Sequence, residues 1–138
     1  MLSSFVSLYL SMKTTYQTLT VWQVSIDLVE QIYVVTRSFP EDEKFNVVSQ
    51  MRRCAVSIPS NIAEGHGRKS GGDFIRFLRV SFGSTSELET QLHISKRLQL
   101  IDQNEFDECD ARLTAVRKML NKLIKYEEAK LATKKLHN

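Results

Sequence analysis

The scarcity and clustering of glycine constrain this chain more than any other feature. Four of its five glycines lie within residues 65–72, and the whole chain has only two prolines. Because glycine and proline make most tight turns, the rest of the chain has few ways to reverse direction and must form long elements. Sandwiches and barrels need many turns. The sequence therefore predicts an all-α protein.

Apolar side chains recur at alternating intervals of three and four residues, which is the spacing of one helix face. The strictest run joins Phe106, Cys109, Leu113, Val116, Leu120, Leu123 and Glu127. The full pattern predicts four helices, at about 21–38, 40–64, 73–98 and 103–132. Since the connections between them are short, we expect an antiparallel up-down-up-down four-helix bundle.

Local signals predict where these helices begin and bend. Three pairs of residues have the spacing of helix caps: Thr20 with Gln23, Ser70 with Asp73, and Asp102 with Glu105. The second helix is expected to start near Pro40 or Asp42. Pro59 lies inside it and removes an amide donor, so we expect a kink near Pro59 rather than an end.

The domain organisation expected from these patterns is simple. Residues 1–19 form an N-terminal extension that is disordered or partly ordered, 20–132 the bundle, and 133–138 a frayed basic tail. Residues 1–12 carry no charge. They lack the basic region and cleavage site of a signal peptide and are too short to cross a membrane. Translation starting at Met1 or at Met12 is compatible with this organisation.

The chain carries few of the residue patterns that chemistry requires. Cys54 and Cys109 form no CxxC pair, so we expect buried free thiols and a cytoplasmic location. The Glu-x-x-His pairs of di-iron bundles and the HExxH motif are missing from the sequence. We therefore expect no catalytic residues, metal or cofactor, and a protein that is not an enzyme.

The middle of the chain is basic. Residues 44–97 contain nine basic and four acidic side chains. Arginine binds phosphate in a bidentate geometry, so the candidate nucleic-acid-binding residues are Arg52, Arg53, Arg68, Lys69, Arg76 and Arg79. The alternative is that arginines cross-link the bundle, for example through an Arg53–Glu87 pair. The glycine-rich stretch matches neither phosphate-loop motif closely.

Small residues cluster where the second and third predicted helices meet. Cys54, Ala55, Ser57, Ser81, Gly83 and Ser84 would let the two backbones approach closely. The third helix is apolar on more than one face, which predicts a further packing partner. From this pattern, Gly83→Leu is expected to disrupt folding or assembly.

Residues 49–92 closely resemble the core of the bacterial four helix bundle protein family, also called 23S rRNA intervening-sequence proteins. The resemblance covers residues 14 to about 125 and departs from the family in the 1–11 extension and at Gly71-Gly72. Its most recognisable segments are SIPSNIAEG (57–65), GRKS (67–70), FIRFLR (74–79) and GS..ELE (83–89).

The resemblance implies properties that spacing does not show. Members are often encoded inside insertions in the large ribosomal RNA gene without being structural parts of the ribosome. The family is similar to the accessory protein of diversity-generating retroelements, a basic bundle that works with a reverse transcriptase and nucleic acid. Relatives assemble as ring-like homopentamers, and no enzymatic activity is established for the family.

The residues and the resemblance together lead to two functional hypotheses. The first is a nonenzymatic homo-oligomer, expected to be a pentamer, that binds RNA or DNA (RNA favoured) through basic residues around the ring. The second is a protein-interaction scaffold with no nucleic-acid ligand, whose surface is the exposed apolar side of the third helix.

Overall fold

The computed structural model describes Ser4 and residues 15–137. In this part of the chain four long α-helices form the fold and no strand occurs, which confirms the predicted all-helical bundle. The helices are α2 (Thr20–Thr36), α3 (Ser49–His66), α4 (Gly71–Arg97) and α5 (Gln103–Leu136), and a short 3-10 turn, η1 (Tyr16–Thr18), precedes them.

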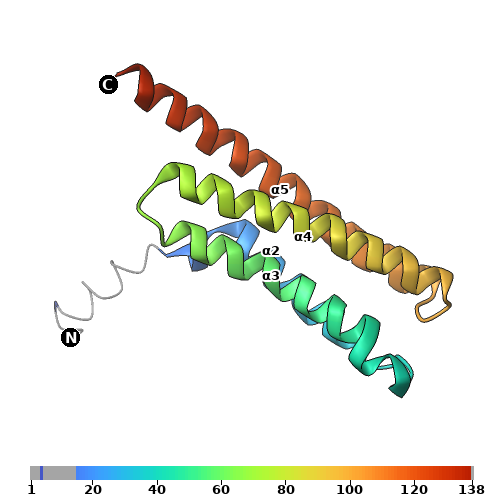
Figure 1. Cartoon of the computed structure of the whole chain (residues 1–138). Coiled ribbons are helices and arrows are strands. Elements are labelled where there is room, and N and C mark those ends of the chain that lie inside the picture. The colour runs from blue at the N-terminus through green and yellow to red at the C-terminus, as the bar shows by residue number, and fades with distance from the viewer. Residues whose placement is uncertain (1–3, 5–14, 138) are drawn as a thin grey trace.

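The four helices enclose one core. Each packs against its neighbours in sequence, and α2 also packs against α5, which closes the bundle. Figure 1 shows the chain reversing direction at each connection. The core consists mainly of completely buried aliphatic side chains, among them Leu28, Ile32, Met51, Ile58, Ile62, Leu78, Leu88, Leu92, Leu113 and Leu120.

The apolar run of α5 follows the predicted seam for most of its length. Phe106, Cys109, Leu113, Val116 and Leu120 are all buried, but Leu123 is only partly buried and Ile124 takes its place in the core. An α-helix has 3.6 residues per turn, so a stripe repeated every 3.5 residues drifts around it. The seam therefore shifts by one residue at Ile124, and Glu127 is buried as predicted.

Two of the three predicted caps are confirmed. Ser70 Oγ accepts a hydrogen bond from the Asp73 amide at 3.3 Å. Asp102 and Glu105 form a full capping box, in which each side chain accepts from the other's amide, at 2.7 and 3.0 Å. The predicted Thr20 cap was wrong. Leu19 occupies the cap position of α2 without a side-chain bond.

The end of α4 uses a residue where glycine is more common. Gln99 has a φ of 60°. Its amide bonds to the Lys96 carbonyl, and the Leu100 amide bonds to the Ser95 carbonyl. This is the Schellman arrangement, which ends a helix on a left-handed residue. It turns the chain into α5 without a glycine.

The predicted start of the second helix was wrong. Residues 41–48 form a 3-10 turn, η2 (Glu41–Glu43), and a π-helical turn, η3 (Lys44–Val48), before α3 begins at Ser49. Asn46 departs from helical geometry, with φ −110° and ψ −109°, and its side chain donates to the Asp42 carbonyl at 3.1 Å. Proline at position 40 and three adjacent acidic residues do not fix which kind of helical turn follows.

Within α3 and α4, the structure tests the predictions made for Pro59 and for the close approach of the two helices. Helix α3 continues through the buried Pro59, and a kink there stays a prediction. Gly83 is exposed, and a methyl group added to it would have nothing within 4 Å, so the reason given for Gly83→Leu to disrupt folding was wrong. The other small residues do allow close approach: Cys54 and Ser57 bond to Ser84, and Ser81 bonds to the Ile58 carbonyl. A further close approach occurs at Gly65, where an added Cβ would lie 2.6 Å from Phe77 Cβ.

The two ends of the chain differ in how far they are described. The prediction for residues 1–14 lies outside the described residues except at Ser4. Tyr16 packs against Trp22 with ring centroids 5.3 Å apart. At the other end, α5 continues to Leu136, beyond the predicted helix end. None of the described helices is long and apolar enough to cross a membrane.

Candidate nucleic-acid interface

The structure separates the six predicted cations into two groups. Arg68 and Lys69 lie in the α3–α4 connection, and Arg76 and Arg79 lie in the first turns of α4. Arg52 and Arg53 lie near the start of α3. At 1.5 Å per residue, these two arginines are about 20 Å from the last residue of α3. The six residues therefore do not form one patch.

Two arginines beside the α3–α4 connection flank a single aromatic ring. The Arg68 and Arg76 guanidiniums lie 5.3 and 4.6 Å from the centroid of Phe77. Each also has a carboxylate on its own side of the loop: Arg68 bonds to Glu64 at 2.6 Å, and Arg76 lies 3.7 Å from Asp73. All four charged side chains are substantially exposed, so these pairs are weak and both arginines stay accessible to an anion.

Gly65 makes this arrangement possible. Because it has no side chain, the backbone of α4 can pack close enough for Phe77 Cβ to occupy the space of the missing methyl. Gly65 is itself buried, although it lies within three residues of the exposed loop. The Phe77 side chain, near which Arg68 and Arg76 lie, is thus packed closely against Gly65 of α3.

The other two cations of this group differ in their contacts. Arg79 pairs with Glu128 of α5 and so ties the start of α4 to the end of α5. Lys69 makes no ion pair or side-chain hydrogen bond with any residue that the structure describes. It is the most available cation of the connection.

Arg52 and Arg53 are neighbours with opposite roles. Arg52 is held by α2: its Nε donates to Thr36 Oγ1 at 3.0 Å and its guanidinium stacks on Tyr33 at 4.5 Å. Arg53 is exposed, and the predicted Arg53–Glu87 ion pair is not formed among the described residues. Glu87 instead lies near Cys54, where it adds to the effect of burial in raising the pKa of that thiol to about 12.

Sequence reasoning missed the largest group of cations. Residues 117–137 contain seven basic and two acidic side chains, a net charge of +5. All six lysines among them are exposed: Lys118, Lys122, Lys125, Lys130, Lys134 and Lys135. The positive charge of this segment is not apparent from the net charge of the whole of α5, because the acidic first half of the helix nearly cancels it.

The fold brings the two basic segments to the same end of the molecule. The Arg79–Glu128 pair joins them, and an added Cβ at Gly71 would lie 3.7 Å from Leu131. Figure 1 shows the α3–α4 connection and the end of α5 on the same side of the bundle. Residues 64–79 and 117–137 together hold eleven basic and four acidic side chains, of which Arg117 is paired with Glu89 in the second half of α4. We call this region the basic end.

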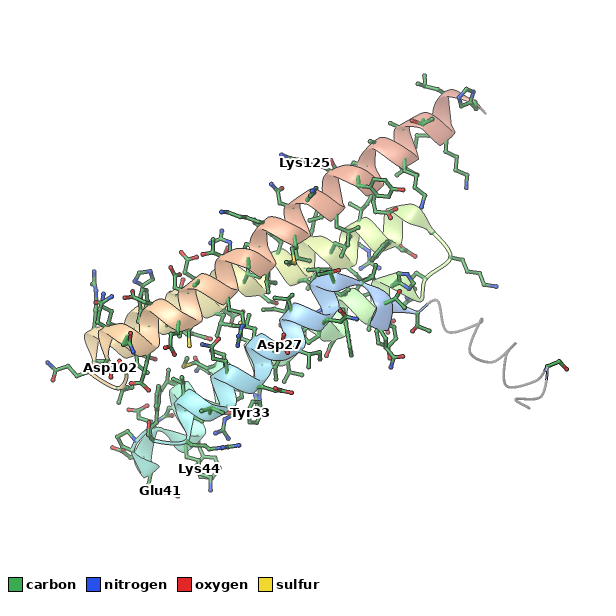
Figure 2. All side chains as sticks on the ribbon, turned by 180° about the vertical axis from the view of Figure 1, so that it is seen from behind. Asp27, Tyr33, Glu41, Lys44, Asp102 and Lys125 are labelled. Carbon is green, nitrogen blue, oxygen red and sulfur yellow. The ribbon has the colours of Figure 1, made fainter. Side chains whose placement is uncertain are left out.

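The opposite end is acidic. Residues 37–48 and 96–112 together hold five basic and eight acidic side chains. Figure 2 shows Glu41 and Asp102 at this end and Lys125 farther along α5. We call this region the acidic end. A basic end of net +7 and an acidic end of net −3 give the bundle a long-range field that its total charge of +3 conceals.

The described residues offer little for metal or thiol chemistry. No group of three His, Cys, Asp or Glu side chains in this part of the chain is placed to hold a metal ion. Cys54 and Cys109 are free and buried, as predicted. Burial raises the pKa of Cys109 to about 11, with Glu105 and Glu108 adding to the effect. Both thiols are therefore protonated and unreactive at neutral pH.

The fold and the charge distribution define a helical bundle with one strongly cationic end. The chain belongs to the family of 23S rRNA-intervening sequence proteins, whose model matches residues 17–122. It is similar to a crystal structure from the S23 ribosomal protein family of Bacteroides thetaiotaomicron VPI-5482, a protein described as having unknown function. The two share 25% identity and a TM-score of 0.71, over 76% of this chain and 95% of that one. The comparison with curated proteins gave no match.

Proposed function

We propose that this protein is a nonenzymatic, oligomeric nucleic-acid-binding protein of the 23S rRNA-intervening sequence type, with RNA as the favoured ligand. The observation that carries the proposal is the basic end, where the α3–α4 connection and the second half of α5 place cations side by side. The free, buried cysteines are compatible with action in the cytoplasm.

Binding at the basic end relies on the phosphate backbone. Lys69 and the exposed lysines of α5 supply charge without a competing carboxylate, except Lys130, whose Nζ lies 3.7 Å from Glu127. The Phe77 ring lies close to the guanidiniums of Arg68 and Arg76. Each phosphate that the protein neutralises releases condensed counterions, so affinity depends steeply on salt. Such contacts position the ligand and carry little sequence information.

Charge reversal at the basic end tests this proposal. In the double variant Arg68→Glu/Lys69→Glu, affinity for a labelled RNA should fall by at least about tenfold at 50 mM salt. The slope of log affinity against log salt should decrease by about 0.7–0.9 for each phosphate that the variant no longer neutralises. Fluorescence anisotropy over a salt series measures both quantities.

The matched control lies at the end of α4 that is far from the α3–α4 connection. Lys96→Glu/Arg97→Glu changes the net charge by the same amount, but at the acidic end. If both variants lose affinity equally, binding follows net charge alone and the basic end is not the site. If the wild-type protein shows no salt-sensitive affinity for RNA or DNA at about 50 mM salt, the proposed function is wrong.

We also propose that copies of the chain assemble into a closed homo-oligomer, with five-fold symmetry as the expected form. The outward side of α4 supports this, because Val80 and Ile94 are 47% and 45% exposed there and Gly83 leaves open space. A heterologous contact that closes into a ring would cover this side and repeat the basic end around an axis. In sedimentation, Val80→Glu/Ile94→Glu should be monomeric at micromolar concentration.

The same apolar side of α4 supports the second hypothesis, a protein-interaction scaffold. The two are separated by comparing variants. Loss of assembly in Val80→Glu/Ile94→Glu, with assembly kept in the control Val34→Glu on α2, assigns the surface to self-association. A wild-type protein that is monomeric and free of nucleic acid after purification at low salt favours the scaffold.

A further inference from the structure

The α2–α3 connection forms a recess that the basic end does not include. It has a volume of about 420 Å³ and is lined by Tyr33, Lys44, Phe45, Val48, Ser49, Arg52, Arg53 and Val56. We propose that this recess binds one unpaired nucleotide of a single strand, with its base against the aromatic side chains and its phosphate against Lys44 and Arg53. This inference rests on the proposed function in that both assume a nucleic-acid ligand. The recess is a separate site from the basic end.

The first support is an exposed aromatic ring that does not pack in the core. Phe45 is 86% exposed, although it is a large apolar side chain in a well-packed bundle. It lies in the irregular turn Lys44–Val48, where the backbone of Asn46 departs from helical geometry. In a regular helix starting near Asp42, Phe45 would be placed by the same periodicity as the core residues. The irregular turn instead presents the ring to solvent at the edge of the recess.

The second support is a flat surface in the lining of the recess. The Arg52 guanidinium stacks on the Tyr33 ring at 4.5 Å, and its Nε is bonded to Thr36 Oγ1. The guanidinium is therefore held in one orientation before any ligand binds. Bases of unpaired nucleic acid stack on both aromatic rings and arginine planes. Figure 2 shows Tyr33 and Lys44 in the same region of the molecule.

The third support is the charge of the lining. Lys44, Arg52 and Arg53 are cationic, and none of the residues that line the recess is acidic. Arg53 has no ion pair within the part of the chain that the structure describes. Lys44 Nζ lies 3.9 Å from the exposed Glu41 carboxylate and 5.8 Å from the centroid of the Phe45 ring. The anionic part of a ligand would thus meet two weakly engaged cations beside the stacking surface.

These features favour a nucleotide over an acidic peptide. A peptide carboxylate would use the cations, but it would need no planar guanidinium–aromatic pair and no solvent-facing ring. A nucleotide joins a planar base to a phosphate, and the recess offers a surface for each. Its volume lies in the range of small-ligand sites. In a duplex the faces of each base are covered by the neighbouring base pairs and cannot stack on these side chains. The site therefore predicts a preference for single strands.

The test compares a labelled single-stranded oligonucleotide with a duplex of the same length. Phe45→Ala should lower single-strand affinity by about fivefold to a hundredfold, the usual effect of removing one stacking ring. Duplex affinity should stay within about twofold, because paired bases do not stack on the ring. Phe45→Tyr should keep wild-type behaviour. Val34→Ala is the matched control, since Val34 is exposed but does not line the recess.

The outcomes separate this inference from the proposed function. If Arg68→Glu/Lys69→Glu weakens binding of both probes while Phe45→Ala affects neither, the basic end binds nucleic acid and the recess assignment is overturned. If the wild-type protein binds neither probe, titration with adenosine monophosphate tests the recess alone. Amide shifts confined to Phe45, Arg52 and Arg53 would then support it. The absence of a nucleotide-induced shift at these residues would overturn it, as would an acidic peptide whose binding depends on Phe45.

Discussion

The basic and acidic ends of the bundle are built from the same helices but differ in what their charges do. At the basic end, Lys69 and most of the α5 lysines have no partner among the described residues. At the acidic end, Glu105 and Asp102 cap α5 through a reciprocal capping box. The acidic side chains nearest the helix start thus have a structural role, whereas the lysines of the basic end have none that the contacts reveal.

Helix electrostatics account for only part of this difference. A helix favours acidic residues in its first turn and basic residues in its last, and the effect fades beyond those turns. Glu105 in α5 and Lys96 and Arg97 in α4 follow that rule. Lys118, Lys122 and Lys125 lie too far from the end of α5 to benefit. Exposed lysines are ordinary on the solvated face of a helix, and here they are also available to an anionic ligand.

The largest effect is expected where the basic end is packed most tightly. Gly65→Ala should destabilise the protein by about 2 kcal/mol, because the new methyl would lie 2.6 Å from Phe77 Cβ and overpacking outweighs the gain in helix propensity. Urea unfolding measures the change. Since Phe77 positions Arg68 and Arg76, RNA affinity should fall as well.

Gly83→Ala is the matched control for Gly65→Ala. Gly83 is exposed within α4 and has open space around it, so alanine should stabilise the protein by about 0.5–1 kcal/mol. Equal stability of the two variants would show that the α3–α4 contact at Gly65 is looser than the structure indicates.

The helix caps provide a smaller contrast between the two ends. Asp102→Ala removes the 2.7 Å hydrogen bond that the Asp102 side chain accepts from the Glu105 amide. This change should lower the free energy of unfolding by about 1 kcal/mol. Ser70→Ala removes one longer bond, of 3.3 Å, and should cost about 0.5 kcal/mol. Thermal unfolding of both variants gives the order. A larger loss for Ser70→Ala would mean that the glycine-rich connection depends on its cap more than the bond length suggests.

Features decided by nearby residues could be predicted from the sequence, and those decided by distant contacts could not. The Ser70 and Asp102 caps depend on residues three positions apart, and both predictions hold. Arg53–Glu87 was inferred from an assumed register between two helices, and a small error in rotation was enough to make it wrong. The basic end could not be predicted, because its two segments, 64–79 and 117–137, lie about fifty residues apart in the sequence and meet only in the folded chain.

The smallest expected effect uses Cys109 as a probe of the acidic end. Burial is the main reason that its pKa is raised to about 11, Glu105 and Glu108 add to it, and Arg112 opposes it. Glu108→Gln should therefore lower the pKa of Cys109 by a fraction of a unit, and Arg112→Gln should raise it. The ultraviolet absorbance of the thiolate during an alkaline titration measures both shifts.

The same shifts predict opposite changes in stability. A thiol whose pKa is raised in the folded protein contributes stability below its ordinary pKa of 9.0, and that contribution is lost as the pH rises through about 11. Glu108→Gln narrows the gap between the two pKa values, so this variant should lose less stability over that range than the wild type, and Arg112→Gln should lose more. High salt should reduce both differences, because Glu108 and Arg112 are exposed and screened. Shifts of the same sign in the two variants would show that the side chains act on Cys109 through packing, and that the carboxylates of the acidic end exert no measurable field there.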